Sequence, residues 1–129
     1  MSINLNHPIK IIFNEIEIDH YLPSIKFKID LHVKQFTHFL AYSGEIWIDC
    51  NNWDQFSKAL SEGGDAILND MDNSFFIHII KTNGSIVFTW SINRQDPDGN
   101  VMSAGYSSNI TDDAYAVIRN EFIDYPKWW

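Results

Sequence analysis

Hydrophobic and polar residues alternate along several stretches of the chain, as they do in strands that bury one face. Residues 25–33 place isoleucine, phenylalanine, leucine or valine at every second position, with lysine, aspartate and histidine between them. Residues 86–92 alternate in the same way, and residues 74–82 form another apolar run before them. Each stretch predicts a β-strand with one buried face. Asn83-Gly84 separates the last two and predicts a hairpin with a type I′ turn, in which both central residues have positive φ.

Two further strands are predicted from less regular patterns. The apolar positions of residues 9–18 change phase along the stretch, which predicts a bulge near Asn14-Glu15. Residues 36–49 supply one long strand that Ser43-Gly44 bends or splits in two. The residues expected on its buried face are Phe36, Leu40, Tyr42, Ile46 and Ile48. A later Pro-Asp-Gly turn within residues 96–100 links two strands, because these residue types favour tight turns.

Two stretches have the spacing of helices. From Asn52 to Ser61 apolar residues recur at helical intervals, with Asn52 as the predicted N-cap and Gly63-Gly64 as the stop. Near the end of the chain Thr111 is the predicted cap of a second helix, and acidic residues follow it in the first turn, where the helix dipole favours them. The predicted buried stripe of this second helix consists of Ala114, Val117, Ile118 and Phe122.

The order of these elements predicts a single α+β domain over residues 1–129. The domain is expected to be mainly antiparallel β-sheet, with about six strands, and curved or sandwich-like. A short helix follows the third strand, and an amphipathic helix lies near the C-terminus. A chain of 129 residues that is 45% hydrophobic and 15% aromatic is long enough to bury one sizeable core.

Acidic residues are concentrated in the second part of the chain, and the formal net charge is −8. Residues 1–44 hold four lysines and four acidic residues, whereas residues 45–129 hold five basic and thirteen acidic residues. In the densest part, residues 45–72, seven acidic residues meet only Lys58. Such a surface either keeps the protein soluble or steers a basic protein partner towards it. It argues against nucleic acid as a direct ligand, because phosphates favour a basic surface.

Trp47 is the aromatic residue that stands out within this acidic part. It shares one strand face with Glu45 and Asp49, opposite Ile46 and Ile48. An aromatic side chain among carboxylates is typical of the anchor of a protein–protein contact, although a second layer that covers Trp47 fits the pattern equally well. The candidate partner-binding residues are therefore Glu45, Trp47, Asp49, Asp54, Asp65, Asp70 and Asp72.

Motifs for catalysis or metal binding are not recognisable. The five histidines lack the spacing of zinc ligands. Residues 96–100 do not continue as a calcium loop, because Val101 and Ser107 stand where that loop needs glycine and glutamate. Cys50 has no glycine-rich turn beside it. We therefore expect no enzymatic activity, no cofactor and no metal ion, although a carboxylate pair that meets only in the folded protein stays open.

Cys50 is also the only cysteine, which excludes a disulfide framework and indicates a reducing compartment. Residues 1–7 have neither the basic start nor the apolar stretch of a signal peptide, and no apolar run is long enough to span a membrane. We therefore expect a cytoplasmic protein with no membrane partner. The sequence does not predict the oligomeric state.

Four stretches between Ser24 and Asp124, about three quarters of the chain, carry a resemblance to a known family. They are the strand segment Gly44-Glu45-Ile46-Trp47-Ile48, the helix with Trp53, Phe56 and Leu60, the hairpin about Asn83-Gly84, and the terminal helix that opens with Thr111-Asp112. In this order they resemble the bacterial immunity proteins of polymorphic and contact-dependent toxin systems, particularly the WapI-type group. The resemblance implies a cytoplasmic protein without catalytic residues that binds one cognate toxin domain, often a basic nuclease, and blocks its active site or its access to substrate.

Taken together, charge and resemblance predict an immunity protein that binds and neutralises a cognate, basic, nuclease-type toxin domain through an acidic surface. Carboxylates in the stretch of residues 45–72 would pair with lysines and arginines of the toxin in place of nucleic-acid phosphates. Two alternatives remain open. One is a small-ligand-binding or hydrolytic domain that uses a cavity in the sheet, and the other is a homodimeric structural or adaptor subunit with an exposed aromatic surface.

Overall fold

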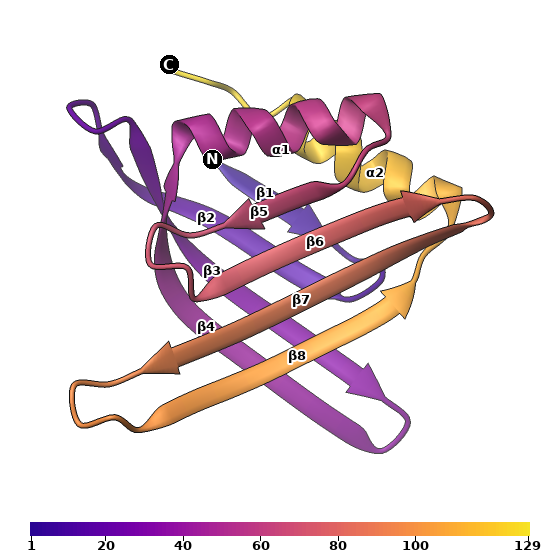
Figure 1. Cartoon of the computed structure of the whole chain (residues 1–129), viewed down its shortest axis with the longest axis horizontal. Coiled ribbons are helices and arrows are strands. Elements are labelled where there is room, and N and C mark those ends of the chain that lie inside the picture. The colour runs from indigo at the N-terminus through magenta and orange to yellow at the C-terminus, as the bar shows by residue number, and fades with distance from the viewer.

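The computed structural model describes residues 1–129 as two four-stranded antiparallel sheets and two helices (Figure 1). In sheet A the strands lie in the order β1 (Ser2–Leu5), β2 (Lys10–Asp19), β3 (Ser24–Gln35) and β4 (His38–Asp49). In sheet B the order is β5 (Ala66–Asn69), β6 (Phe75–Thr82), β7 (Ser85–Gln95) and β8 (Val101–Asn109). Helix α1 (Cys50–Glu62) connects the two sheets, and α2 (Asp112–Ile123) follows sheet B. The expected α+β class with mainly antiparallel sheet is confirmed.

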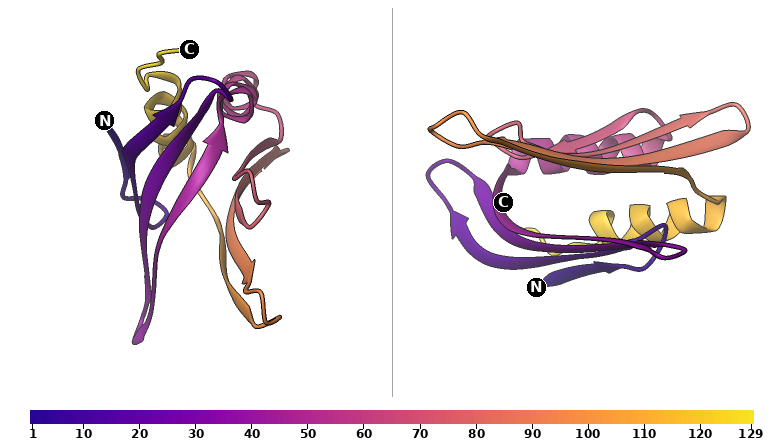
Figure 2. Two further views of the ribbon diagram at one scale, coloured as in Figure 1. Left: turned by 90° about the vertical axis from the view of Figure 1, so that its left-hand side faces the viewer. Right: turned by 90° about the horizontal axis from the view of Figure 1, so that it is seen from below.

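The two sheets stack with their strands crossing, and both helices lie at one end of this sandwich (Figures 1 and 2). Buried residues from both sheets and both helices form one continuous core. At its centre the Phe13 ring lies 5.6–6.3 Å from the rings of Phe27, Phe75 and Phe122, all near edge-on. Each buried side chain of this kind contributes roughly 1.5–3 kcal/mol to folding. At the opposite end the sheets diverge towards the β3–β4 and β7–β8 hairpins (Figure 2).

Two local features of the strands follow the sequence pattern. Thr82 lies opposite Ser85 in the β6–β7 pairing, which confirms the hairpin. The register of β2 against β3 shifts between Glu15 and Glu17, which confirms the bulge. The type I′ assignment is wrong, because Gly84 has φ +80° while Asn83 is not among the residues with positive φ. Positive φ at the second central residue alone is the requirement of a type II turn.

The structure has eight strands instead of the expected six or so. Strands β1 and β5 have four residues each, too few to show an alternating pattern. Strand β4 is not split, because Gly44 lies in a continuous ladder, where a Cβ would collide with the Tyr42 side chain. The expectation for Phe36 is wrong: it lies in the β3–β4 turn with φ 53°, and its side chain is 95% exposed.

Helix α1 begins three residues earlier than expected. Its N-cap is Asp49, whose carboxylate accepts a hydrogen bond of 2.7 Å from the Asn51 N–H. The predicted cap, Asn52, instead exchanges hydrogen bonds of 2.9 and 3.1 Å with Asn69 of β5. The predicted stop is confirmed, since Gly63 ends the helix in the left-handed conformation with φ 73°.

Helix α2 confirms its predicted cap, because Thr111 Oγ1 accepts a hydrogen bond of 3.1 Å from the Ala114 N–H. Its buried stripe is displaced from the prediction. Ile118 and Phe122 are buried as expected, whereas Val117 is exposed. Tyr115 is buried instead, and its hydroxyl donates a hydrogen bond of 2.7 Å to the Leu60 carbonyl oxygen of α1. The contact with α1 thus rotates the buried face of α2 away from Val117.

Candidate functional site

Trp47 lies on the outer face of sheet A, where it is half-buried. The Lys26 Nζ atom lies 6.0 Å from the centre of its ring. The same Nζ atom lies 3.8 Å from a Glu45 carboxylate oxygen and 3.9 Å from one of Glu17. Trp47 and Glu45 therefore share a face, as predicted, but a lysine lies between the carboxylates.

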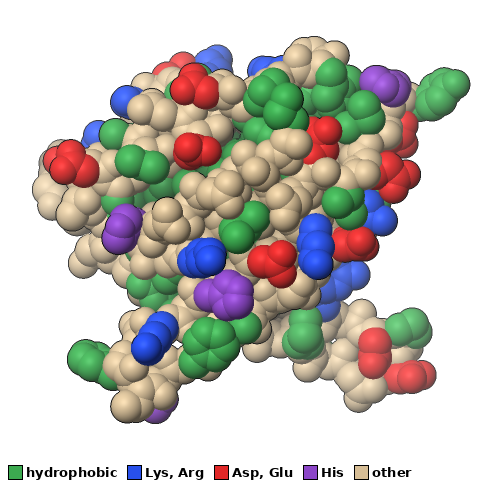
Figure 3. All heavy atoms as spheres, turned by 180° about the vertical axis from the view of Figure 1, so that it is seen from behind, with side chains coloured by type: hydrophobic (Ala, Val, Ile, Leu, Met, Phe, Trp, Pro, Cys, Tyr) green, Lys and Arg blue, Asp and Glu red, His purple; other side chains and the backbone are tan.

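The outer face of sheet A as a whole is mixed in charge and not acidic. Figure 3 shows basic and acidic side chains interspersed over this side of the molecule. The strand pairing places four lysines and five acidic residues at its outward positions, namely Lys10, Glu17, Asp19, Lys26, Lys28, Asp30, Lys34, Glu45 and Asp49. Trp47 therefore lies among charges of both signs.

Asp49 and Asp54 are both engaged within the chain. Asp49 caps α1, as described above. The Asp54 carboxylate accepts a hydrogen bond from Trp129 Nε1, at 3.0 and 3.1 Å to its two oxygens, and forms an ion pair with Lys127. The C-terminal residues thus fold back onto α1, and Trp129 is half-buried there.

These carboxylates also affect the neighbouring thiol. Burial raises the pKa of Cys50 to about 11, and the negative charges of Asp49 and Asp54 add to this effect while Lys127 opposes it. The thiolate is the reactive form of cysteine. Cys50 therefore stays protonated and unreactive near neutral pH.

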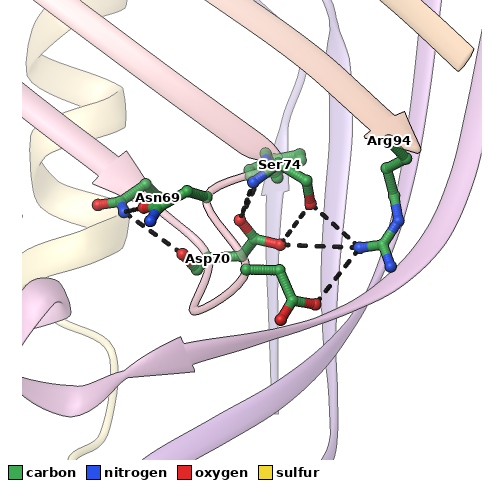
Figure 4. A network of polar contacts seen from close by, with 7 residues as sticks. Asn69, Asp70, Ser74 and Arg94 are labelled. Atoms are coloured by element: carbon green, nitrogen blue, oxygen red, sulfur yellow. Dashed lines mark hydrogen bonds and ion pairs between the residues drawn. The ribbon is translucent and has the colours of Figure 1, made fainter. Parts of the chain in front are cut away.

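Asp70 is buried, with 2% of its surface exposed, in the loop between β5 and β6. Its carboxylate accepts hydrogen bonds from the Ser74 N–H and hydroxyl, both at 2.7 Å, and from the Phe75 N–H at 3.0 Å. Arg94 of β7 donates to the Ser74 hydroxyl at 3.1 Å and lies 4.0 Å from Asp70 and 3.6 Å from Asp72 (Figure 4). Asp70 therefore links this loop to β7, and its carboxylate is not accessible to a partner in this structure. Asp72 lies beside it and is exposed.

The structure brings part of the predicted contact residues together, but it engages most of their carboxylates within the chain. The Met71 N–H donates a hydrogen bond of 2.8 Å to the Trp47 carbonyl oxygen, so the end of β4 lies beside the β5–β6 loop. Asp49 and Asp70 line one small hollow there, of about 280 Å³. Asp65 lies beyond the other end of α1 and is exposed.

The fold creates a different acidic surface at the helical end of the sandwich. The C-terminus of α1 and the N-terminus of α2 lie at the same end, joined by the bond between Tyr115 and Leu60 (Figure 1). Four carboxylates are exposed there without an ion pair inside the chain: Glu62, Asp65, Asp112 and Asp113. We call these four residues the acidic quartet.

The surroundings of the quartet are acidic as well. The helices with their flanking residues, 49–65 and 111–127, hold eight acidic and three basic residues, a net charge of −5 out of −8 for the whole chain. Two bases lie near the quartet: Lys81, whose Nζ atom lies 4.9 Å from the centre of the Tyr115 ring, and Lys58, one helical turn before Glu62 on α1. Only Asp65 of the quartet was among the predicted contact residues. The acidic first turn of α2 is visible in the sequence, but its position next to the end of α1 is not.

Three buried tyrosines also have shifted pKa values, and so does Asp96, whose pKa is lowered mainly by the hydrogen bond from the Asn100 side chain. Burial raises the pKa of Tyr125, and its hydrogen bond to the Glu15 carboxylate raises it further. Burial also raises the pKa of Tyr115, with Arg119 opposing, and that of Tyr42, with Arg94 opposing. All three phenols therefore stay neutral well above physiological pH.

The surface has three sizeable hollows, all open to solvent, of which the smallest, about 450 Å³, lies at the β7–β8 turn. The largest, about 840 Å³, borders the Asp70 network and is mainly polar, with Asp72, Ser74, Ser91, Asn93 and Arg94 among its lining residues. A second hollow of about 460 Å³ lies between the β1–β2 connection and the start of α2, next to Asp113 of the acidic quartet. No three side chains of histidine, cysteine, aspartate or glutamate are arranged so that they could hold a metal ion.

Neither helix combines the length and the apolar sequence that a membrane-crossing segment requires. Comparison of the chain with protein-family models, with curated proteins and with solved structures finds no match in any of the three.

Proposed function

We propose that this protein is an immunity-type inhibitor, which binds a basic, nuclease-type toxin domain through the acidic helical end. The observation that carries the proposal is the acidic quartet, whose four exposed carboxylates gather where the two helices meet. The four stretches that resemble WapI-type immunity proteins, among them both helices, support the same role. The proposal moves the contact surface from the strand with Trp47 to the ends of α1 and α2.

The mechanism that we propose is electrostatic steering followed by occlusion. A nuclease domain must present lysines and arginines to bind phosphates. The quartet has no internal cations to displace, so its carboxylates can pair with those side chains directly. A field of one sign raises association rates by a factor of about 10 to 1,000 at low salt, and added salt removes this gain. A toxin held in this way would have its substrate-binding surface covered.

The role is tested by expressing the chain together with the toxin domain encoded beside its gene. The expected result is survival of cells that die when the toxin domain is expressed alone, together with co-purification of the two proteins. Death of the cells despite soluble expression of both proteins would overturn the proposed function.

The surface is tested by association kinetics of purified proteins. One variant neutralises the quartet through Glu62→Gln, Asp65→Asn, Asp112→Asn and Asp113→Asn. We expect its association to be at least about tenfold slower at low salt, with the difference vanishing at high salt.

A matched control removes four charges elsewhere, through Glu17→Gln, Asp30→Asn, Glu45→Gln and Asp98→Asn. Its association rate should stay within about twofold of the wild type, because steering depends on charges near the contact. Equal slowing of both variants would assign the effect to total charge and would contradict the proposed surface. Thermal unfolding of each variant verifies that it is folded.

A further inference from the structure

Strand β8 is an edge strand whose outer backbone groups have no partner. It pairs only with β7, and it is the last strand of sheet B. The Ile110 N–H donates to the Ile86 carbonyl at 2.9 Å, just beyond the strand. Residues of an antiparallel pair alternate between hydrogen-bonded and non-hydrogen-bonded positions. The even-numbered residues of β8 therefore bond to β7, and the odd-numbered ones point their N–H and C=O groups away from the sheet.

Five residues carry these free groups, namely Val101, Ser103, Gly105, Ser107 and Asn109. The other edges of the two sheets are protected in ways that natural proteins use against unwanted pairing. Strands β1 and β5 are only four residues long. Strand β4 is longer, but the Met71 N–H occupies the Trp47 carbonyl, and Glu45 and the lysines of β3 charge its surface. Strand β8 has nine residues, with no charge and no proline.

The side of sheet B that faces away from the core is uncharged as well. The strand register places serine, threonine, asparagine, glutamine, glycine, aliphatic residues, Phe76 and His78 at its outward positions, and no aspartate, glutamate, lysine or arginine. Two copies of a protein with a net charge of −8 repel each other. This repulsion between the two copies is weakest where the facing surfaces carry no charge. Strand β8 and the outward face of sheet B form such a surface.

We propose that β8 pairs with β8 of a second copy of this chain, antiparallel and about a two-fold axis at Gly105. Gly105 is the middle residue of Val101–Asn109, so this register leaves no part of either strand unpaired. Val101 meets Asn109 and Ser103 meets Ser107, and their outward groups form about ten main-chain hydrogen bonds across the axis. Such an interface uses the same patch on both subunits, as two-fold dimers require. Two four-stranded sheets become one continuous sheet.

The charges at the two ends of β8 predict how this dimer responds to salt. Asp96 and Asp98 precede the strand, and Asp112 and Asp113 follow it. The antiparallel arrangement brings the first pair of one copy towards the second pair of the other. Salt screens this repulsion. Dimerisation therefore strengthens with added salt, whereas association with a basic toxin weakens, so the two proposals succeed or fail separately.

The test uses the purified chain alone, with its mass measured by sedimentation velocity and light scattering. The wild type is expected at about twice the monomer mass of 15.0 kDa. Its dimer dissociation constant is expected to decrease as the salt concentration rises from about 0.05 to 0.5 M. A mass of 15.0 kDa at every concentration and salt level would overturn the proposal.

Proline substitutions locate the interface. Ser103→Pro removes an outward N–H without removing a hydrogen bond to β7, and we expect dimerisation at least about tenfold weaker. Ser103→Ala keeps the N–H and should dimerise like the wild type. Ala41→Pro is the matched change at an outward position of β4, and it should leave the dimer intact. Equal dimerisation of Ser103→Pro and wild type, or loss of the dimer in Ala41→Pro alone, would overturn the assignment to β8.

Hydrogen exchange of the wild type decides the question even where a variant fails to fold. The amides of Ser103, Gly105 and Ser107 have no acceptor within the chain. In the dimer they are bonded, so their exchange should slow as the protein concentration rises. Fast exchange of these three amides in a sample of dimer mass would overturn the proposed pairing.

Discussion

Sheets A and B have the same number of strands and the same antiparallel order, yet they hold their charges in opposite places. Sheet A carries nine charged side chains on its outer face, where the Lys26 Nζ atom lies 3.8–3.9 Å from carboxylate oxygens of Glu17 and Glu45. Sheet B has an uncharged outer face and keeps a carboxylate, Asp70, buried in the loop between its first two strands. Burial, and not the density of acidic residues along the sequence, therefore decides whether a carboxylate is bonded within the fold or left exposed to solvent.

Replacing the buried carboxylate should have the largest effect. Asp70→Ala leaves two backbone N–H groups and the Ser74 hydroxyl without their acceptor. Each such group costs about 1–3 kcal/mol, so we expect a loss of about 3 kcal/mol in the free energy of unfolding and a Tm lower by about 10 °C. Urea and thermal unfolding measure both.

The neighbouring Asp72→Ala is the matched control, because Asp72 is the exposed partner of Arg94 at 3.6 Å. Its loss should be below about 1 kcal/mol. Similar losses for the two variants would remove the distinction between buried and exposed carboxylates on which the comparison depends.

Between the sheets, the buried phenols should make the protein sensitive to alkali. The folded state raises the pKa of Tyr125, whereas the unfolded chain ionises this group near pH 10. The unfolded state therefore loses protons first as the pH rises, and the free energy of unfolding decreases above about pH 10, by about 1.4 kcal/mol for one such tyrosine at pH 11. In Tyr125→Phe this part of the decrease should disappear.

Unfolding measured from about pH 8 to pH 11 tests this expectation, since only the slope above about pH 10 reports ionisation. Tyr21, which is fully exposed, supplies the control variant Tyr21→Phe. That variant should keep the slope of the wild type. A slope that Tyr125→Phe leaves unchanged would show that Tyr125 ionises equally in both states.

At the junction between sheet A and α1, Asp49 tests whether a candidate contact residue is a helix cap. Asp49→Ala should lower the free energy of unfolding by about 1 kcal/mol, because the Asn51 N–H loses its acceptor. Asp49→Asn keeps the cap while removing the charge, and should be close to the wild type. Equal losses in both variants would indicate that the charge, and not the hydrogen bond, is what matters.

The smallest effect is expected on the outer face of sheet A. Lys26→Met removes two exposed ion pairs but keeps the aliphatic cover over Trp47. Exposed pairs contribute about 0–1 kcal/mol, and salt screens them. We expect a change below about 0.5 kcal/mol at low salt and none at about 0.5 M salt, measured by urea unfolding. A loss as large as that of Asp70→Ala would contradict the contrast between the sheets.

Features set by neighbouring residues were predictable from the sequence. Alternation identified β3 and β7, glycine identified the end of α1, and Thr111 identified the start of α2. Short strands were not predictable, because four residues cannot establish a period of two. Val117 was misplaced because the buried stripe of α2 depends on where α1 lies, through the bond between Tyr115 and Leu60.

The candidate site depended even more on tertiary structure. The burial of Asp70 results from its contacts with Ser74 and Phe75 after the chain has turned, and nothing in the acidic run distinguishes it from Asp72. The acidic quartet joins residues from two helices that lie far apart in the sequence. Charge density along the chain therefore predicted that a carboxylate surface exists, and it could not predict which carboxylates form it.

Cys50 has a use that follows from its position at the first residue of α1. Its side chain is buried, its pKa is raised to about 11, and its N–H is bonded to the Pro23 carbonyl at 2.9 Å. An electrophilic label can react with this thiol only while α1 is detached from sheet A. The chain has no other cysteine, so the labelling rate measures how often that opening occurs. A partner bound to the helical end would lower the labelling rate, whereas a second copy paired along β8 would leave it unchanged.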